Sequence, residues 1–344
     1  MRNLFTLGAK DIGIDLGTAN ILITIKGKGI VLREPSVVAI DIKTGEILAT
    51  GHEAKEMLGR TPENIKAVRP LKDGVIADFT ATQLMLKNMI RKVCRRYNAR
   101  RPRIVVGVPS GITEVEERAV EEAVTQAGAR EVYLMEEPMA AAIGAGLNVA
   151  DASGSMVVDI GGGTTEVAVI SLGGIVISKS LRIAGDELNE DIINYIKREE
   201  NLAIGETTAE EIKMKIGCAT PLMTDLSLEI RGRDLTTGLP RNITLKSSQI
   251  INAMEESIGK IVDTVKQALE KTPPELASDL IEKGIMITGG GALIQNLDKL
   301  LSTETNIPIY VANDPLDCVV KGTEKTLEDL EKLKQVLINA RKRR

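Results

Sequence analysis

The chain contains little histidine and few aromatic residues. His52 is the single histidine among 344 residues, which argues against catalytic triads and proton shuttles built on this side chain. Four tyrosines, two phenylalanines and no tryptophan leave little surface on which single-stranded nucleic acid could stack. Basic and acidic residues number 44 and 48, so the chain lacks the basic excess typical of phosphate-backbone binders. We therefore expect no nucleic-acid partner.

Cysteines and long apolar runs are also scarce. Cys94, Cys218 and Cys318 are scattered, which predicts a reduced, cytosolic protein without a disulfide framework or a cysteine-based zinc site. No apolar run approaches the roughly 18 residues that a membrane helix needs. The first ten residues contain Leu4, Phe5 and Leu7, but they do not form a secretory signal. This end of the chain is either a frayed terminus or a short tip that touches a membrane.

An internal repeat is the main organising feature of the sequence. Strand-like segments separated by glycine turns begin near Asp11 and recur from Met156, so that Asp15 and Asp159 occupy equivalent positions about 144 residues apart. A repeated β-meander predicts two domains of like topology that face each other. The expected strands are 11–16, 21–25 and 30–32 in the first copy, and 156–160, 166–171 and 175–178 in the second.

Amphipathic helices follow each meander. Thr113 and Glu116 form a capping box, and apolar residues from Val115 to Ala127 recur on one face of the helix that begins there. Segments 34–77 and 187–250 interrupt the repeat, and we interpret each as a small inserted subdomain; the second contains a hairpin. Further helices are expected from Asp186, over 248–271 and over 326–340, followed by a basic tail at 341–344 that is either solvated or faces an anionic membrane or partner.

Glycine-rich turns follow the first strand of each meander. Successive turn amides can bind a phosphate, and the hydroxyls of Thr18, Thr164 and Thr165 can add hydrogen bonds. The carboxylates of Asp15 and Asp159 would repel phosphate unless a cation intervened, which indicates Mg²⁺ held through water. The alternative is two ordinary hairpins, but the duplication favours a nucleotide. A third glycine run, 289–291, could pack against a flat base, and the chain has no P-loop.

Hydrolysis of a nucleotide needs a group that orients water at the γ-phosphate. Glu136 and Glu137 precede Pro138 at the expected junction between a strand and a helix, which leaves a carboxylate at the helix N-terminus. Both glutamates could instead be helix-start residues that interact with the helix dipole. Since the chain has one histidine, a carboxylate or a threonine is the best available group for positioning water.

At these residues the sequence resembles the actin/chaperone-ATPase/sugar-kinase superfamily and, within it, the MreB family of bacterial actins. DIGIDLGTAN (11–20) and VVDIGGGTTEVAV (157–169) are similar to the two phosphate motifs, and ITGGGALI (287–294) to the adenosine motif. EEPMAAAIGAG (136–146) and DPLDCVVKGT (314–323) resemble the two connecting helices. The resemblance extends over residues 10–325, including stretches outside the nucleotide motifs, at 26–40, 69–79 and 272–285.

The resemblance implies an α/β, actin-like (ribonuclease H-like) duplicated core. Two domains, each with an inserted small subdomain, would hold the nucleotide in the cleft between them. The implied division is subdomain IA at 1–33, 78–150 and 316–344, IB at 34–77, IIA at 151–186 and 251–315, and IIB at 187–250.

The same resemblance implies a site for ATP and Mg²⁺. Asp15 and Asp159 would hold the hydrated metal, while Glu137 and Thr164 would position the attacking water. For Glu210, Glu211 and Lys213 the alternative is a solvent-facing helix. The residues expected to bind the nucleotide are Gly17, Thr18, Ala19, Asn20, Gly161, Gly162, Gly163, Thr165, Gly185, Asp186, Glu210, Glu211, Lys213, Gly289, Gly290, Gly291 and Ala292.

The function that the resemblance implies is a slow ATPase that polymerises head to tail into membrane-associated filaments and directs wall elongation to maintain a rod shape. Paired protofilaments would use the helix that contains Val115, for which core packing is the alternative. The loop at 94–102 is basic here, where relatives often have an apolar membrane loop. The other classes considered are a small-molecule kinase or chaperone-type ATPase on the same fold, and a scaffold that binds nucleotide without turnover.

Overall fold

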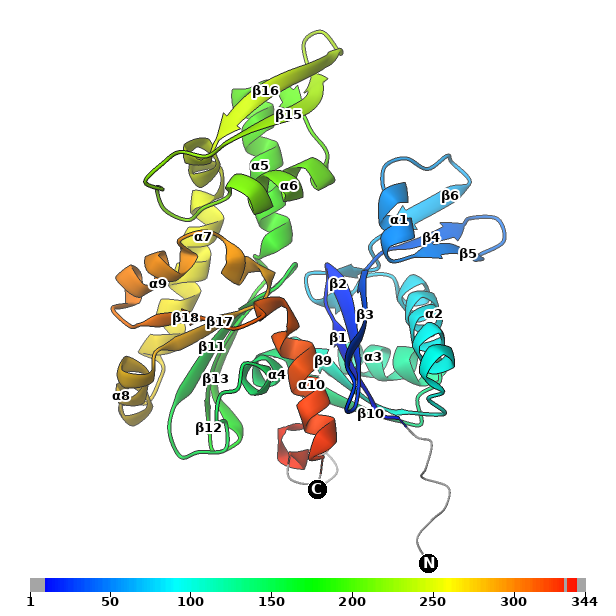
Figure 1. Cartoon of the computed structure of the whole chain (residues 1–344), viewed down its shortest axis with the longest axis vertical. Coiled ribbons are helices and arrows are strands. Elements are labelled where there is room, and N and C mark those ends of the chain that lie inside the picture. Colours follow the sequence, from blue (N-terminus) through cyan, green and yellow to red (C-terminus); the bar gives the residue numbers. More distant parts are fainter. Residues whose placement is uncertain (1–9, 331–332, 339–344) are drawn as a thin grey trace, which may run out of the picture.

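The computed structural model describes residues 10–330 and 333–338, and it shows two large lobes side by side, each with a smaller sheet above it. Each lobe is built on a five-stranded mixed sheet, and the two sheets face each other across two packed helices (Figure 1). We call the smaller sheets with their short helices the first cap and the second cap.

The first lobe contains the sheet β10-β9-β1-β2-β3. β1 and β2 pair antiparallel, whereas β9 runs parallel to β1 and β10 parallel to β9. Isoleucines of β1 and β2 are fully buried, because both faces of these strands are covered. The strands are β1 (Ile12–Leu16), β2 (Asn20–Ile25), β3 (Gly29–Pro35), β9 (Arg103–Val108) and β10 (Glu131–Glu136).

The second lobe repeats this topology with the order β13-β12-β11-β17-β18. A three-stranded meander is again followed by two parallel strands, so the predicted duplication of the meander is confirmed and extends to two further strands. The strands are β11 (Ser155–Ile160), β12 (Thr165–Ser171), β13 (Gly174–Leu181), β17 (Ile285–Thr288) and β18 (Ile309–Val311).

The caps occupy the two expected insertions. In the first cap, β4 lies between β5 and β6, and in the second cap β15 lies between β14 and β16. A short hairpin, β7 (Leu71–Lys72) with β8 (Val75–Ile76), connects the first cap to its lobe. The cap elements are β4 (Val38–Asp41), β5 (Ile47–Thr50), α1 (His52–Met57), β6 (Ile65–Val68), β14 (Leu202–Ala203), α6 (Glu206–Ile216), β15 (Ser227–Asp234) and β16 (Pro240–Lys246).

Helices cover the outer faces of both lobes, and two of them lie between the sheets (Figure 1). The helix predicted over 248–271 is confirmed as α7, and the predicted capping box of Thr113 and Glu116 begins α3. The helices are α2 (Phe79–Tyr97), α3 (Glu114–Gln126), α4 (Glu137–Gly144), α5 (Gly185–Glu199), α7 (Ser247–Glu270), α8 (Pro274–Lys283), α9 (Leu297–Thr305) and α10 (Cys318–Glu328), with the 3₁₀ turns η2 (Gly290–Leu293), η3 (Pro315–Asp317) and η4 (Lys334–Val336).

α4 and α10 cross each other between the lobes at a pair of glycines. A Cβ at Gly144 would overlap the carbonyl of Cys318, and a Cβ at Gly322 would overlap the carbonyl of Ala140. Each helix thus supplies one glycine against the backbone of the other, which allows unusually close packing. Lys325 of α10 also donates to the carbonyl oxygen of Ile143, at 2.9 Å.

Two expectations about helices are wrong. α10 ends at Glu328 and is followed by the 3₁₀ turn η4, so the helix expected over 326–340 does not continue; residues 331–332 and 339–344 lie outside the described residues. The buried face of α3 is formed by Val120, Ala123 and Val124, whereas Val115 is 76% exposed. Core packing of Val115 is therefore excluded. The N-terminal apolar residues Leu4, Phe5 and Leu7 also lie outside the described part of the chain.

Within the described residues, no helix combines the length and the apolar character that spanning a membrane would require.

Candidate nucleotide site

The two glycine-rich turns of the meanders touch each other between the lobes. A Cβ at Gly162 would lie 2.8 Å from the Cβ of Ala19, and a Cβ at Gly163 would lie 2.7 Å from the hydroxyl oxygen of Thr18. Positions 162 and 163 therefore need glycine because a side chain there would prevent the two loops from packing together. This need is separate from any close contact between the loop and a phosphate. The duplicated motifs form one composite site, whereas each would be a separate hairpin if the lobes did not meet.

The N-terminus of α5 fixes the second loop. The backbone amides of Gly185 and Asp186 donate to the carbonyl oxygens of Gly161 and Gly162, at 3.2 and 2.7 Å. Lys213 of α6 donates to the carbonyl of Gly185 at 2.5 Å, and burial lowers its pKa although Asp186 and Glu210 oppose that shift. The residues predicted to lie on the ribose side of the nucleotide are thus next to the second loop.

A group of carboxylates lies beneath the two loops. Burial raises the pKa of Asp15 to about 8, with Asp159 and Asp317 contributing repulsion and Arg33 opposing it. Burial also raises the pKa of Asp159 to about 6, although the hydroxyl of Thr288 donates to its Oδ1 at 2.7 Å. These shifts mean that the two side chains are costly to ionise without a nearby cation.

Glu137 belongs to the same group and begins α4 directly after β10, as predicted. The side chain is 8% exposed, and burial together with Asp15, Glu166 and Asp159 raises its pKa well above the ordinary value. Several carboxylates that repel one another in a buried place fit a bound divalent cation. Within the described residues, no three acidic, histidine or cysteine side chains are arranged to coordinate an ion directly.

The three predicted phosphate-binding threonines differ in their surroundings. Thr18 accepts a hydrogen bond from the amide of Gly74 at 3.1 Å, and the methyl group of Thr164 lies beside the same Gly74. Thr165 is fully buried and donates to the carbonyl of Ile183 at 2.7 Å, so its hydroxyl has a structural partner. Thr18 and Thr164 therefore both contact the β7–β8 hairpin of the first lobe.

The third glycine run lies behind the second loop. Gly289 and Gly291 pack against Ile160 so closely that a Cβ on either would overlap it, and Ala292 is 4% exposed. Gly289 and Gly290 are both partly exposed, and Gly290 lies beside Leu316. Packing against β11 accounts for Gly289 and Gly291, whereas a Cβ at Gly290 would not meet β11.

The α6 residues are divided between two environments. Glu210 forms an ion pair of 2.7 Å with Lys55 of the first cap, whereas Glu211 pairs with Lys215 on the exposed face of α6 at 2.6 Å. Glu211 therefore lies on a solvent-facing side of the helix, which was the alternative to nucleotide binding. Asn20 is exposed at the start of β2.

Glu166 is a buried acid that the sequence interpretation missed. It is fully buried on β12, accepts from the amide of Ser110 at 3.3 Å and from the hydroxyl of Ser180 at 2.7 Å, and burial raises its pKa to about 8. Ser110 belongs to the first lobe, so Glu166 connects the lobes below the loops. The signal available was a glutamate directly opposite Asp159 in the antiparallel pair, within an otherwise apolar strand.

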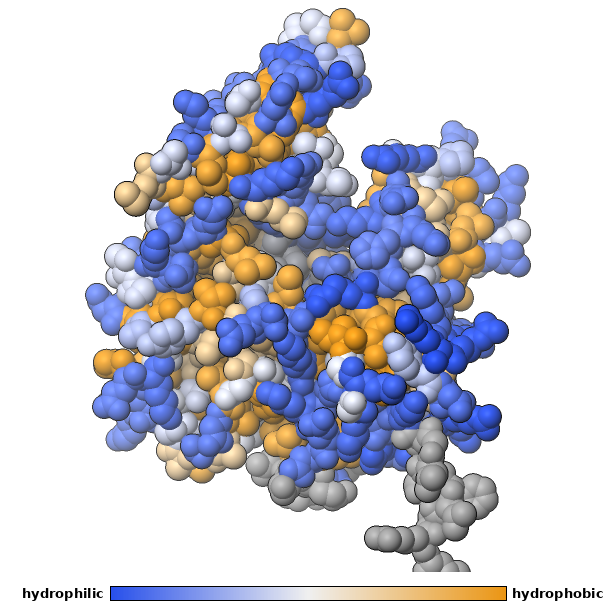
Figure 2. Space-filling model, viewed as in Figure 1, coloured by the Kyte–Doolittle hydropathy of each residue, from blue (hydrophilic) through white to orange (hydrophobic). Residues whose placement is uncertain are grey.

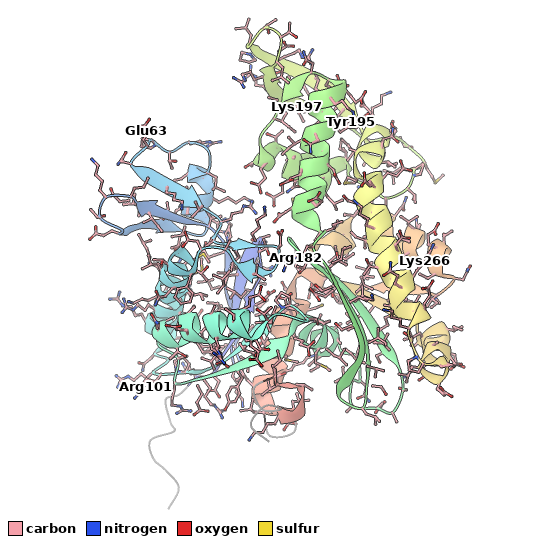
Figure 3. All side chains as sticks on the ribbon, turned by 180° about the vertical axis from the view of Figure 1, so that it is seen from behind. Glu63, Arg101, Arg182, Tyr195, Lys197 and Lys266 are labelled. Carbon is pink, nitrogen blue, oxygen red and sulfur yellow. The ribbon has the colours of Figure 1, made fainter. Side chains whose placement is uncertain are left out.

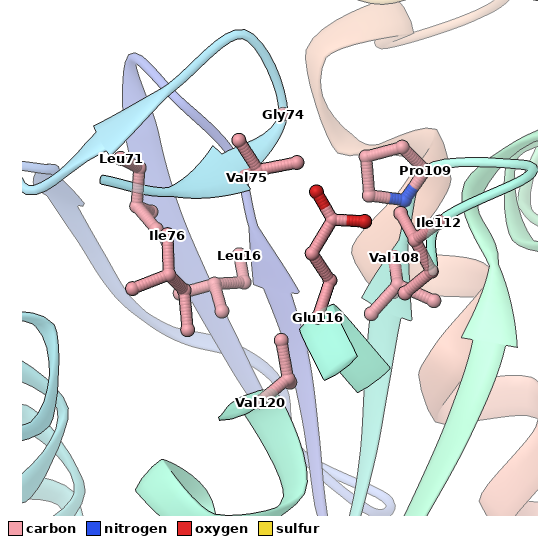
Figure 4. Close-up of a pocket in the computed structure, with 11 residues that line it drawn as sticks. Leu16, Leu71, Gly74, Val75, Ile76, Val108, Pro109, Ile112, Glu116 and Val120 are labelled. Atoms are coloured by element: carbon pink, nitrogen blue, oxygen red, sulfur yellow. The ribbon is translucent and has the colours of Figure 1, made fainter. Parts of the chain in front are cut away.

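An apolar cavity adjoins the first loop. It is small, with a volume of about 20 Å³, and lies between β1, the β7–β8 hairpin and the N-terminal part of α3 (Figure 4). Glu116 is the acidic residue in its lining, and its carboxylate accepts from the amide of Thr113 at 2.7 Å. The cavity therefore lies directly behind the contact between Thr18 and Gly74.

The basic segment at 94–102 includes the last turn of α2. Tyr97 ends this helix, and the charged groups of Lys28 and Arg96 lie 5.4 and 5.5 Å from its ring centre. Lys10, the first described residue, donates to the carbonyl of Tyr97 at 2.7 Å. The chain thus enters the fold beside this basic segment.

Comparisons with known proteins agree with this arrangement. The model of the MreB/Mbl protein family matches residues 9–335. The chain is 54% identical over 325 residues to the cell shape-determining protein Mbl of Bacillus subtilis, covering 94% of this chain and 98% of that protein. It is 57% identical over 328 residues to the cell shape-determining protein MreB of Escherichia coli K12, covering 94% of each.

Solved structures give the same result. A crystal structure of MreB5 of Spiroplasma citri bound to ADP has a TM-score of 0.90 and 40% identity, over 95% of this chain and 98% of that one. A structure of the same protein bound to AMPPNP has a TM-score of 0.88. The MamK double helical filament, at 21% identity and a TM-score of 0.78 over 92% and 98% of the chains, supports the fold alone. The predicted actin-like fold is confirmed, and these matches do not favour a kinase or a chaperone.

Proposed function

The chain belongs to the MreB/Mbl family, and on that premise we propose that it is an ATP-binding bacterial actin that polymerises into filaments and hydrolyses ATP slowly. The observation that best supports this proposal is the meeting of two glycine-rich loops above a group of buried carboxylates. Relatives with this fold have been solved with ADP and with AMPPNP, which supports a nucleotide as the ligand.

The proposed ligand is ATP with Mg²⁺. The backbone of 17–20 and 161–165 would bind the phosphates, and Gly185, Asp186, Glu210, Lys213 and Gly290 would border the sugar and the base. Asp15 and Asp159 would hold Mg²⁺ through water, and the ion would supply charge neutralisation for the phosphates. The raised pKa values of these two side chains support a cation as their partner.

Glu137 and Thr164 are the groups proposed to orient water for hydrolysis. Glu137 lies at the positive N-terminal end of α4, and Thr164 lies on the second loop, directly before β12. Since these groups belong to different lobes, closure of the lobes would bring the water-orienting pair together. Hydrolysis would then follow closure, and its slow rate would set filament lifetime.

Self-association is proposed along two directions. Head-to-tail contacts would involve the first cap and the second cap, which correspond to the proposed subdomains IB and IIB of the division into IA, IB, IIA and IIB. Pairing of protofilaments would use α3. Val115, an apolar side chain on that helix, is 76% exposed and so is accessible for the second contact. Replacing Val115 with Glu should weaken pairing and leave head-to-tail assembly, as seen in filament widths by electron microscopy; unchanged widths would exclude Val115.

We also propose that the chain contacts the inner face of the membrane and takes part in wall elongation. The names of the curated relatives support a role in cell shape. The basic groups around Tyr97, beside the start of the described chain, support electrostatic attraction to anionic lipid that cooperates with Leu4, Phe5 and Leu7. Removal of residues 1–8 should reduce binding to anionic liposomes, and equal binding would exclude this terminus.

Sedimentation tests the polymer directly. The chain is centrifuged at several concentrations with Mg·ATP, with Mg·ADP and without nucleotide, and phosphate release is followed in the same tubes. A nucleotide-dependent pellet above a threshold concentration is expected. Protein that stays in the supernatant at every concentration would contradict polymerisation, and rapid phosphate release in that supernatant would indicate an enzyme that acts on a small molecule.

A further inference from the structure

Ion pairs connect the two lobes at the mouth above the loops. Arg69, at the base of the first cap, lies 2.8 Å from a carboxylate oxygen of Glu206 and 3.7 Å from one of Asp186, both in the second lobe. Lys55 of the first cap pairs with Glu210 of α6 at 2.7 Å. Figure 2 shows a notch between the first cap and the second cap, with hydrophilic side chains along its lower edge. These pairs thus cross the opening from one lobe to the other.

Arg69 is the most enclosed cation of this group. Its side chain is 20% exposed, against 31% for Lys55, and its buried Nε has no hydrogen-bond partner. Two acceptors on the opposite lobe face two different nitrogens of one guanidinium, a geometry that a single ammonium could not reproduce. Partial burial also weakens the screening that makes exposed ion pairs ineffective.

The cations and the acids that form these ion pairs lie on opposite sides of the mouth. Arg69 and Lys55 come from the first lobe, whereas Asp186, Glu206 and Glu210 come from the second. Although burial raises the pKa of Glu210, the hydrogen bond and charge of Lys55, helped by Arg69 and Lys213, hold it below its ordinary value. Asp186 also lies in the first turn of α5, whose amides hold the second loop, so Arg69 acts on the element that fixes that loop.

We propose that Arg69 is a positioning residue that clamps the lobes over the bound nucleotide, by holding Asp186 and Glu206, and so slows nucleotide exchange. The inference rests on the proposed function in so far as it concerns the nucleotide; the contact between the lobes is independent of it. Because the ribose-side residues are among its partners, opening of the clamp would release both the lobes and the sugar contacts.

The distance between the caps tests the clamp without nucleotide. Glu63 of the first cap and Lys197 of α5 lie on opposite sides of the opening (Figure 3) and are both exposed, so each can be replaced by a spin-labelled cysteine after Cys94→Ser removes the partly exposed native thiol. Arg69→Gln should lengthen and broaden the distance measured by electron–electron resonance. Arg69→Glu combined with Glu206→Arg should recover the original distance in part, since Asp186 would then face a carboxylate.

Lys260→Gln is the matched control, because the ion pair of Lys260 with Glu256 joins two exposed residues of the same helix, α7. It should leave the distance unchanged. An unchanged distance in Arg69→Gln, or a charge swap no different from Arg69→Glu alone, would overturn the clamp. Either result is decisive whether or not the protein binds nucleotide.

Exchange kinetics supply the functional readout. Release of a fluorescent ADP analogue from Arg69→Gln should be about fivefold faster than from the original chain, the factor expected for one partly buried ion pair. Raising the salt concentration should accelerate release from the original chain more than from the variant. Failure of the original chain to bind the analogue would contradict the proposed function, whereas tight binding with equal release rates would contradict only the clamp.

Discussion

The two lobes meet in two places, and the contacts there are of different kinds. At the base, α4 and α10 cross with small buried side chains and with Gly144 and Gly322 against the opposite backbone. At the mouth, long charged side chains such as Lys55 and Arg69 reach across from one lobe to the other. The base depends on steric fit, which tolerates no added atom, whereas the mouth depends on charge, which salt can screen.

This difference indicates where the molecule can move. Close packing at the base allows rotation about the crossing and opposes separation, while ion pairs at the mouth can break and form again without loss of the core. The loops and their carboxylates lie between these two contacts. Changes at the base should therefore alter stability most, changes between the contacts should alter chemistry, and changes at the mouth should alter exchange.

Gly322→Ala should have the largest effect. The added Cβ would overlap the carbonyl oxygen of Ala140, so the helices must separate, and we expect a loss of about 3 kcal/mol or more in the free energy of unfolding. Gly259→Ala on α7 is the control, because nothing lies within 4 Å of its added Cβ and the helix should gain about 0.5–1 kcal/mol. Urea denaturation measures both, and equal effects would disprove the tight crossing.

Glu137→Ala changes the site directly above the base. If this carboxylate orients water, ATP turnover should fall by about 100-fold or more, while sedimentation with Mg·ATP remains. Phosphate release measured in the pelleting assay reports both quantities. Turnover equal to that of the original chain would remove Glu137 from the mechanism, and loss of the pellet would show that its role is structural.

Glu166→Gln tests the acid that connects the lobes beneath the loops. Because burial raises the pKa of Glu166 from 4.5 to about 8, the folded chain binds a proton there that the unfolded chain has released between those values. This contribution to stability is present below pH 4.5 and is lost as the pH rises towards 8, by up to about 1.4 kcal/mol per pH unit. Glutamine should remove that part of the slope in thermal unfolding of the nucleotide-free chain, and an unaltered slope would contradict the assignment.

Lys55→Gln should have the smallest effect on stability. Its pair with Glu210 is about one-third exposed on both sides, so we expect a loss of at most about 1 kcal/mol, which should disappear at high salt. The comparison with Gly322→Ala at low and high salt distinguishes charge from fit. A loss as large as that of Gly322→Ala would mean that the mouth also carries the stability of the fold.

Much of the fold could be predicted because the repeat is local in sequence. The meander around Asp15 and the one around Asp159 show the same spacing of strands and turns, and the capping box at Thr113 marks a helix start without reference to the rest of the chain. The resemblance to a known family supplied the expected actin-like architecture of two domains, each with an inserted subdomain. The junction of strand and helix at Glu137 followed from the proline beside it.

The parts that could not be predicted depend on contacts between distant segments. Glycine at 162 and 163 was interpreted as a phosphate cradle, but its need for space against Ala19 and Thr18 becomes visible only when the lobes meet. The roles of Glu166 and Arg69 likewise arise from partners in the other lobe. The apolar residues after Thr326 have helical spacing, yet α10 ends at Glu328, since periodicity alone does not determine where tertiary packing stops a helix.

The central claim is that the two loops and their carboxylates form one site for a nucleotide with Mg²⁺. Titration calorimetry of the full chain with ADP, with and without Mg²⁺ and in two buffers of different ionisation enthalpy, tests it most directly. We predict one site per chain, binding strengthened by Mg²⁺, and proton release near pH 7, because Asp15 has a pKa of about 8 before the cation arrives. Absence of binding, two equivalent sites per chain, or binding that neither depends on Mg²⁺ nor releases protons would contradict the account.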